Sequence, residues 1–308
     1  MFQDAEFAIT GTLPASAEWS YEEAFSRNLG LISPSEQERL RQSRVAIAGL
    51  GGVGGVDLVA LARLGIGKFT IADPDVFELR NMNRQYGATR STEGHLKAEV
   101  MRDVVLNINP EAEIRVYCKP IGPENTASFI EGADVFVDAI DAFEIDLRRL
   151  LYRKAQQRGI YALGAGPFGF STAWSVFDPT GMTFDRYYDL SDQMSAVEKF
   201  VAFVAGAAPS STHRPYMDLS YIDLENHTAP SAGFACHLAS GVVAVEVLKI
   251  LLGRGRIYSA PYFHQFDAYR GIYVRKRLRG GNRHPLQRLK RRRLLNFINQ
   301  SNSAVQTG

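Results

Sequence analysis

The sequence predicts an α/β fold built on a doubly wound, mainly parallel sheet with antiparallel strands at its C-terminal side. Short apolar runs, typical of strands buried on both faces, alternate with segments of helical periodicity between residues 44 and 163. A glycine-rich turn joins the first of these runs to the first helical segment. After residue 164, three strand-like runs occur without the regular helical spacers that parallel pairing requires.

The elements follow in order along the chain. Strands are predicted at residues 45–48, 68–73, 113–117, 134–138 and 160–163, and later at 170–177, 262–266 and 271–274. Helices are predicted at residues 35–40, 56–64, 97–107, 145–157, 195–204 and 233–252. The strand–helix alternation in the first half is the pattern that produces a doubly wound sheet.

Three segments are expected in the 308 residues. Residues 1–43 form a helical lead-in, residues 44–274 form the main domain, and residues 275–308 form a basic tail. Within the domain, residues 178–232 are rich in loop-forming residues and are expected to cover a substrate. The net charge of +2 is too small to imply a polyanionic partner for the chain as a whole.

Cysteine content and the N-terminal residues indicate a cytoplasmic protein. Cys118 and Cys236 are the two cysteines, too few for a disulfide framework or a zinc site of the usual spacing. Asp4 and Glu6 stand where a signal peptide would be basic. The apolar run 233–252 contains a histidine, a glutamate and a lysine, so we expect a buried helix and no membrane span.

The glycine-rich turn carries the first functional signal. Gly49, Gly51 and Gly54 form G-x-G-x-x-G between a strand and a helix, with Gly52 beside them, as in Rossmann-like nucleotide sites. Glycines let the backbone approach a phosphate, and the helix N-terminus supplies free N–H groups. Asp73 ends the next strand, where an acid would bind ribose. The alternative is a turn that only packs the helix on the sheet.

By itself this turn favours NAD or FAD over ATP, so an NAD-dependent oxidoreductase is one hypothesis. The sequence shows no compelling set of hydride-site residues. The residues after the second strand read D-x-D-x(5)-N-x-x-R-Q, formed by Asp73, Asp75, Asn81, Arg84 and Gln85. Further on come Lys97 and the run Val-Asp-Ala-Ile-Asp at residues 137–141.

Together with the turn, these motifs resemble the ThiF/MoeB superfamily, the bacterial relatives of ubiquitin-activating enzymes. The match is detailed over residues 27–141 and weaker to about residue 274. The resemblance implies an ATP-dependent adenylyltransferase, which is a nucleotidyltransferase. It assigns Mg²⁺ to Asp141, phosphate contacts to Lys97, Arg84 and Asn81, and the ribose to Asp73.

The resemblance extends to further positions. Asp75, Gln85 and Asp138 are expected to line the nucleotide site, although Asp75 and Asp138 have structural alternatives. Arg84 has the alternative of a surface salt bridge, and Lys97 that of a solvated helix residue. Arg27 resembles an N-terminal arginine that reaches the ATP of a partner subunit, which implies a homodimer.

The expected reaction is attack of an ionised carboxylate on the α-phosphate of ATP. Fixed cations and Mg²⁺ would neutralise the charge that develops, and no general base is required. The four zinc cysteines of many members are absent, so we expect no zinc. Residues 178–232 contain no cysteine and Cys236 falls in an apolar helix, so we expect no enzyme thioester. Ala142 stands where the family often has Asn.

Two classes of carboxylate remain open. The favoured one is the C-terminal glycine of a small ubiquitin-like or sulfur-carrier protein. The alternative is a small-molecule, peptide or tRNA-base carboxylate, because the basic tail can contact phosphates. The cations of the tail are Lys276, Arg277, Arg279, Arg283, Arg288, Lys290, Arg291, Arg292 and Arg293. A basic helix that packs on its own dimer, and a non-catalytic partner subunit, are the remaining hypotheses.

Overall fold

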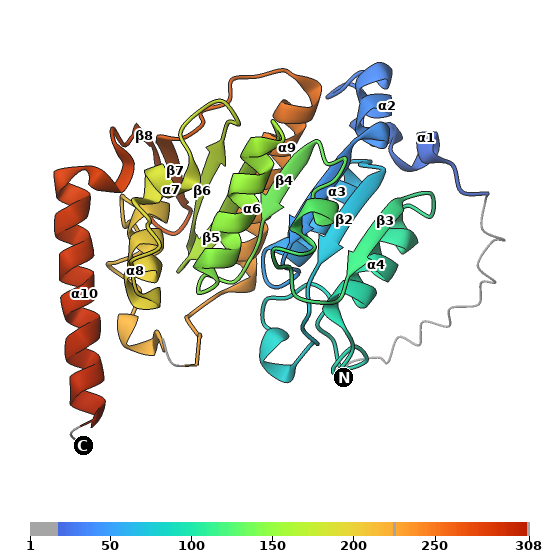
Figure 1. Cartoon of the computed structure of the whole chain (residues 1–308). Coiled ribbons are helices and arrows are strands. Elements are labelled where there is room, and N and C mark those ends of the chain that lie inside the picture. The colour runs from blue at the N-terminus through green and yellow to red at the C-terminus, as the bar shows by residue number, and fades with distance from the viewer. Residues whose placement is uncertain (1–17, 224–225, 307–308) are drawn as a thin grey trace, which may run out of the picture.

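The computed structural model describes residues 18–223 and 226–306, so the first part of the expected lead-in, residues 1–17, lies outside the described residues. One eight-stranded sheet forms the centre, in the order β3-β2-β1-β4-β5-β6-β7-β8 (Figure 1). The strands are β1 Arg44–Ala48, β2 Lys68–Ala72, β3 Glu113–Tyr117, β4 Val135–Asp138, β5 Tyr161–Phe168, β6 Ser171–Phe177, β7 Tyr262–Asp267 and β8 Ile272–Arg277. The first five pair in parallel and the last three antiparallel, which confirms the predicted fold class.

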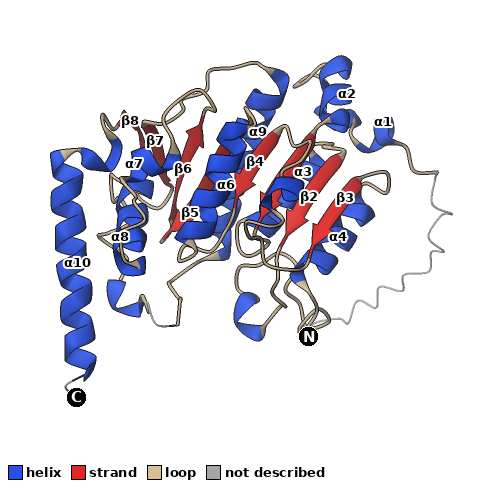
Figure 2. Cartoon of the chain, in the orientation of Figure 1, coloured by secondary structure: helices blue, strands red, loops and turns tan. Residues whose placement is uncertain are grey.

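Helices cover both faces of this sheet (Figure 2). They are α1 Tyr21–Ala24, α2 Pro34–Gln42, α3 Gly54–Arg63, α4 Lys97–Ile108, α5 Thr126–Phe129, α6 Ile145–Gln157, α7 Phe184–Tyr188, α8 Ala196–Ala207, α9 Gly233–Leu252 and α10 Pro285–Gln306. Short 3₁₀ turns are η1 Ser26–Asn28, η2 Leu79–Asn81, η3 Leu219–Tyr221 and η4 Gly281–Arg283.

Two hydrophobic cores result from this layering. One lies between the sheet and the helices α3, α4 and α9, and includes Leu58, Leu61 and Val243. The other lies between the opposite face and α5, α6 and α7, where Phe136 and Tyr152 meet edge to face. The sheet is therefore buried on both sides along β1, β2 and β4, as their continuous apolar runs predict.

Local sequence signals set where several helices begin. Ser33 caps α2, and Glu36 returns its carboxylate to the backbone N–H of Ser33, which completes a capping box. Ser195 and Glu198 form the same arrangement at the start of α8. These caps satisfy N–H groups that the first helical turn leaves without partners.

The strand register brings the predicted motifs to one edge. Ala48 at the end of β1 lies opposite Ala72 of β2 and opposite Asp138 of β4. The residues that follow these three strands therefore lie together at the carboxyl edge of the sheet. Helices α1 and α2 lie at the other edge, which is uppermost in Figure 1.

Among the described residues, α9 is the one helix long and apolar enough to cross a membrane by length and composition. Half of its apolar window is buried, against α3, β5 and β6. This packing is that of a core helix. Its remaining face leaves Phe234 and Val245 more than half exposed, and space is open around Gly241.

The structure corrects two expected boundaries. β5 continues to Phe168 instead of ending at residue 163, because its second half pairs with β6. The tail expected from residue 275 begins within β8, which runs to Arg277 on the edge of the sheet. The remainder of the tail forms α10, which packs on α8 through Leu294 and Ile298.

Candidate nucleotide site

The glycine-rich turn is too tight for side chains at two of its positions. Gly49 has φ +88°, and a Cβ there would lie 2.3 Å from the carbonyl oxygen of Ala139. A Cβ on Gly54 would lie 1.9 Å from the carbonyl oxygen of Gly49. The turn thus passes directly beside the residues that follow β4 and leads into the first turn of α3. Its N–H groups face the same edge as the other candidate residues.

Asp73 fastens this turn to the end of β2. One carboxylate oxygen accepts a hydrogen bond from the N–H of Leu50 at 2.7 Å, and the other accepts from the N–H of Asp75 at 2.9 Å. The side chain is buried, and this burial raises its pKa despite the opposing effect of Lys97. Asp73 therefore shapes the turn, and its ribose contact stays a prediction.

The segment after β2 folds over the turn. Asn81 is buried at the end of η2, where its Oδ1 accepts from the N–H of Glu78 at 3.0 Å. This cap positions the next residues: Cβ atoms built on Gly51 and Gly52 would lie 3.6 Å from Gln85 Nε2 and 3.4 Å from Arg84 Cγ. Arg84 and Gln85 are thus adjacent to the glycine-rich turn.

The guanidinium of Arg84 is held by neutral groups. Its Nη1 donates to the carbonyl oxygen of Arg80 at 3.0 Å and to Asn83 Oδ1 at 2.9 Å. Within residues 18–223 and 226–306, Arg84 forms no ion pair. The surface salt bridge considered as an alternative is therefore not formed in this part of the chain, and the guanidinium of Arg84 has no carboxylate partner there.

Lys97 begins α4 and is almost fully buried. Its Nζ lies 3.0 Å from Asp75 Oδ2, and its N–H donates to the carbonyl oxygen of Asp75 at 2.9 Å. Lys97 is thus not a solvated helix residue. The two residues of the pair are 22 positions apart in the sequence. Their contact therefore brings together the two ends of the segment that contains η2. In the structure, Asp75 is a partner of Lys97, and nucleotide contacts of either residue stay predictions.

Asp138 has a structural partner that the sequence did not reveal. Its Oδ2 accepts from Nε of Arg148 at 2.6 Å, and both side chains are buried. Arg148 also donates to the carbonyl oxygens of Ile140 and Asp141. This arginine, on α6, therefore shapes the whole loop after β4. The spacing of ten residues gave no signal for the pair because it depends on how α6 returns over the strand.

Asp141 lies on the same loop but is exposed. Its Oδ1 accepts from the N–H of Phe143 at 3.0 Å, and it forms no ion pair with any described residue. An exposed carboxylate beside a phosphate turn suits Mg²⁺, which binds hard oxygen ligands and keeps several waters. In the described part of the chain, no three His, Cys, Asp or Glu side chains converge as metal ligands. Asp141 would thus hold the ion together with water and phosphate oxygens.

The covering segment reaches this loop. Phe143 stacks on Phe200 of α8 and on His227, with both ring centroids 4.6 Å away. Arg148 lies over the ring of Phe203, 4.3 Å from its centroid. Residues of the 178–232 segment therefore pack against Phe143, which is two positions after Asp141 in the sequence. Ala142, which stands where the family often has Asn, is exposed between them.

Arg27 is not brought to the site of its own chain. It is exposed in η1, and the neighbouring Asn28 donates to the carbonyl oxygen of Leu64 at 3.2 Å. Leu64 lies just after α3, at the end opposite the glycine turn. The ten residues of α3 separate Arg27 from the turn by about 15 Å.

Both thiols are poor nucleophiles where they lie. Cys236 is fully buried in the first turn of α9, and burial raises its pKa. Its Sγ would lie 3.0 Å from a Cβ built on Gly52, a contact between residues 184 positions apart that no motif predicted. Burial also raises the pKa of Cys118, which is half-buried.

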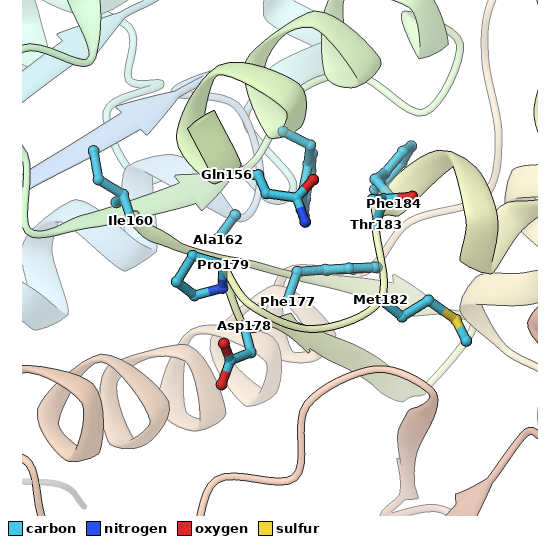
Figure 3. A pocket seen from close by; sticks show the side chains of 10 residues that line it. Gln156, Ile160, Ala162, Phe177, Asp178, Pro179, Met182, Thr183 and Phe184 are labelled. Carbon is cyan, nitrogen blue, oxygen red and sulfur yellow. The ribbon is translucent and has the colours of Figure 1, made fainter. Parts of the chain in front are cut away.

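A small cavity lies away from this edge. Tyr152, Gln156, Ile160, Phe177 and other side chains enclose about 10 Å³ between α6 and the start of β5 (Figure 3). That volume is about the minimum for one water molecule. The cavity is at the amino end of β5, so it does not belong to the candidate nucleotide site.

Comparison with known proteins agrees with this geometry. The ThiF family description matches residues 25–289, which is most of the chain. The chain belongs to the ThiF family. This finding confirms the resemblance that the motifs indicated.

Several relatives place the chain within the family. It is 37% identical over 146 residues to a "tRNA threonylcarbamoyladenosine dehydratase" of Haemophilus influenzae, covering 47% of this chain and 56% of that protein. It is 28% identical over 277 residues to a "Probable adenylyltransferase/sulfurtransferase MoeZ" of Mycobacterium tuberculosis, covering 85% and 63%. The chain thus spans about half the length of the first of these curated relatives.

Solved structures share the fold. E. coli MccB in complex with MccA-N7isoASN matches with a TM-score of 0.65 and 18% sequence identity, covering 84% of this chain and 72% of that one. The E. coli tRNA N6-threonylcarbamoyladenosine dehydratase, TcdA, matches with a TM-score of 0.56 and 21% identity, covering 75% and 95%. At these identities the likeness concerns the fold.

Proposed function

We propose that this chain uses ATP and Mg²⁺ to adenylate a carboxylate at the carboxyl edge of β1, β2 and β4. The observation that carries the proposal is Arg84, whose side-chain methylenes lie beside Gly52 and whose guanidinium forms no ion pair among the described residues. A phosphate group would supply the missing negative charge. Relatives such as the "Probable adenylyltransferase/sulfurtransferase MoeZ" of Mycobacterium tuberculosis support the same reaction.

In the proposed reaction, a carboxylate oxygen attacks the α-phosphorus, and the bond from that phosphorus to the bridging oxygen of pyrophosphate breaks. The attacking group is already ionised at neutral pH, so no side chain has to remove a proton. Arg84 and Lys97 would stabilise charge on the phosphate oxygens, and the N–H groups of the turn would orient them. Mg²⁺ bound at Asp141 would neutralise the departing pyrophosphate.

The favoured substrate is the C-terminus of a small ubiquitin-like or sulfur-carrier protein. A relative in Haloferax volcanii that is 31% identical over 150 residues is named "SAMP-activating enzyme E1", which supports a protein substrate. The second candidate is a carboxylate on a modified tRNA base. It is supported by the Haemophilus influenzae relative, a "tRNA threonylcarbamoyladenosine dehydratase". Cys236 is buried against Gly52, so we propose that neither candidate passes through a thioester on that cysteine.

ATP–pyrophosphate exchange tests this function. Exchange should appear only when the correct carboxylate is added, so a Gly-Gly-ending carrier protein, amino acids and modified tRNA are tested separately. Asp141→Asn should abolish exchange while the melting temperature is kept. Glu144→Gln, an exposed acid three positions further on, is the matched control and should retain exchange. If Asp141→Asn and the original protein exchanged ATP and pyrophosphate at the same rate, Asp141 would have no role in the reaction.

We also propose a homodimer in which α9 packs antiparallel on its copy. Near the N-terminus of α9, a Cβ on Gly233 would lie 3.4 Å from the Cα of Arg84. Just beyond its C-terminus, Arg254 donates to the carbonyl oxygen of Leu31 at 2.8 Å, close in sequence to Arg27. Two antiparallel copies, each about 30 Å long, would therefore carry the partner's η1 segment towards the turn.

Mixing two inactive variants tests this arrangement. Arg27→Ala and Asp141→Asn each damage a different half of the shared site. In a mixed dimer, one site receives both intact residues, so exchange should return when the variants are mixed and re-equilibrated. No recovery, with mixed dimers shown by mass spectrometry, would contradict the role of Arg27 across subunits. Val245→Glu on the exposed face of α9 should give a monomer by light scattering.

A further inference from the structure

The edge of the sheet farthest from the nucleotide turn carries a concentration of cations without acidic partners. They come from the segment before β7, from the edge strand β8 and from the residues just after it, and each is exposed: Arg256, Arg275, Lys276, Arg277 and Arg279. None forms an ion pair with a described residue. The nearby Glu246 is buried and lies 2.5 Å from Lys249. Arg275 and Arg277 share one face of β8, with Arg256 beside them at Tyr258, so this face presents three uncompensated positive charges, whereas Lys276 lies on the other face of the strand.

Aromatic rings lie among these cations. Tyr258 is flanked by two guanidiniums: the Cζ of Arg275 lies 3.8 Å, and that of Arg256 4.8 Å, from its ring centroid. Arg277 lies 6.0 Å from the ring of Tyr262. Such arginine–ring contacts are favourable and hold the guanidiniums in defined planes.

The strand register puts rings and cations on one face. Arg275 lies opposite His264 of β7, and Arg277 lies opposite Tyr262. On the same face, His264 stacks on Trp174 with centroids 4.6 Å apart, and Tyr273 lies parallel to Trp174 at 6.1 Å. Tyr273 is 55% exposed. Helix α9 covers this face of the sheet at β5 and β6, and β8 is the last strand (Figure 1).

We infer that this surface, formed by β8 and residues 256–262, binds single-stranded nucleic acid. Unpaired cations attract the phosphate backbone, and exposed rings and guanidinium planes stack with bases. An acidic peptide would use the cations but has no need of the flanked ring of Tyr258, which is why nucleic acid is favoured. The inference does not depend on the adenylation chemistry.

The structure also distinguishes this surface from α10, where the basic run of the tail lies. Two of the α10-region arginines are occupied, because Arg283 and Arg291 both pair with Asp189, at 3.0 and 2.9 Å. Lys290 donates its Nζ to the carbonyl oxygen of Pro209. The helix packs on α8 with the help of these contacts. Its basic run is thus partly structural, whereas the cations of β8 are free.

Binding of a short fluorescein-labelled single-stranded RNA, followed by anisotropy, tests the inference. Three phosphate contacts predict a slope of about −2.1 for the logarithm of the affinity against that of salt concentration. The triple variant Arg256→Ala/Arg275→Ala/Arg277→Ala should bring the slope close to zero. A matched control removes three exposed, unpaired arginines elsewhere: Arg39→Ala/Arg63→Ala/Arg158→Ala. The control should keep the slope near its original value, and an equal loss in both variants would overturn the proposed location.

Tyr258→Leu tests the stacking part. The loss of one base stack should weaken the affinity for RNA by roughly 5- to 150-fold and leave the dependence of the affinity on salt unchanged. Inorganic polyphosphate, which has no bases, should bind Tyr258→Leu as it binds the original protein. Equal affinity of RNA for both proteins would contradict base stacking. Labelled single-stranded DNA of the same sequence shows whether ribose contributes.

Two further outcomes would overturn the inference. Tighter binding of phosphatidylserine vesicles than of RNA, lost in the triple variant, would make the surface a membrane contact. A change of oligomeric state in the triple variant would make it a subunit contact. ATP–pyrophosphate exchange of the triple variant Arg256→Ala/Arg275→Ala/Arg277→Ala and of Tyr258→Leu should match that of the original protein, because these residues lie on the opposite side of β5 from the turn. Loss of exchange alone would concern the proposed enzyme and not this surface.

Discussion

The parallel and antiparallel halves of the sheet use their polar side chains differently. At the carboxyl edge of β1, β2 and β4, the polar groups are tied to backbone atoms or to each other, as Asp73 is to Leu50 and Asp138 to Arg148. On β7 and β8, cations such as Arg275 and Arg277 are exposed and lie over rings. We propose from this comparison that the parallel half provides the reaction site, while the antiparallel half provides a surface for a larger partner.

The two aspartates of one loop give the sharpest form of this comparison. Asp138→Ala should destabilise the fold by about 3 to 5 kcal/mol, because Arg148 would keep its buried charge without a partner. Asp141→Ala should change the unfolding free energy by less than about 0.5 kcal/mol, because its side chain is exposed. Urea denaturation measures both. Equal stability of the two variants would show that Asp138 is not a structural residue.

Substitution of Arg84 should affect the proposed reaction and leave the stability of the fold nearly unchanged. Arg84→Ala should reduce exchange by about 10²- to 10³-fold, the loss typical of one positioned charge stabiliser. Its unfolding free energy should change little, since its hydrogen bonds are made to Arg80 and Asn83 near the surface. Arg80→Ala, an exposed neighbour, is the control and should retain exchange. Similar rates for both variants would count against a phosphate role for Arg84.

Asp57 provides a pH test in the parallel half. It lies in α3 against α9, and its carboxyl oxygens have no hydrogen-bond partner within the described residues. Burial raises its pKa to about 8, although Ser240 opposes this. The folded state thus keeps a proton that the unfolded chain releases above about pH 4, so stability is lost as pH rises towards 8.

The expected size of this effect is about 2 to 3 kcal/mol between pH 5 and pH 7. It should appear as the difference between the original protein and Asp57→Asn, in which residue 57 no longer titrates. Denaturation at several pH values measures that difference. Parallel stability curves for the two proteins would show that Asp57 ionises normally in the fold.

The smallest effect is expected where α10 joins the fold. Asp189 pairs with Arg283 and Arg291, which together lower its pKa against the effect of burial. Asp189→Asn keeps a residue that tolerates the left-handed backbone found there, with φ 56°. It should cost about 1 kcal/mol or less, since the aspartate is partly solvated. A larger loss would show that α10 is essential to the core.

The parallel half was largely predictable from the sequence. Strand β3 and helix α6 begin and end where the pattern predicts, because buried apolar runs and helical periodicity are local properties. The strand boundaries of the antiparallel half were less predictable from the sequence. β5 extends through Gly164 and Pro167 because it pairs with β6, and β8 extends to Arg277 because an edge strand accepts exposed cations. Such extensions depend on neighbours that a local pattern does not contain.

The candidate site divides in the same way. Its glycines and Arg84 were identified from motif spacing, and the structure places them together. The partners that hold the site were not predictable. Arg148 reaches Asp138 only because α6 folds back, and Cys236 meets Gly52 only because α9 crosses the turn. Both contacts are set by tertiary packing, which motif spacing does not encode.

The central claim is that the turn after β1 binds ATP for adenylation. Isothermal titration of the intact protein with ATP and Mg²⁺, and separately with NAD, tests it most directly. The account predicts saturable binding of ATP with one site per chain, strongly weakened in Arg84→Ala, and no measurable binding of NAD. Binding of NAD without binding of ATP would contradict it and return the turn to a dinucleotide site.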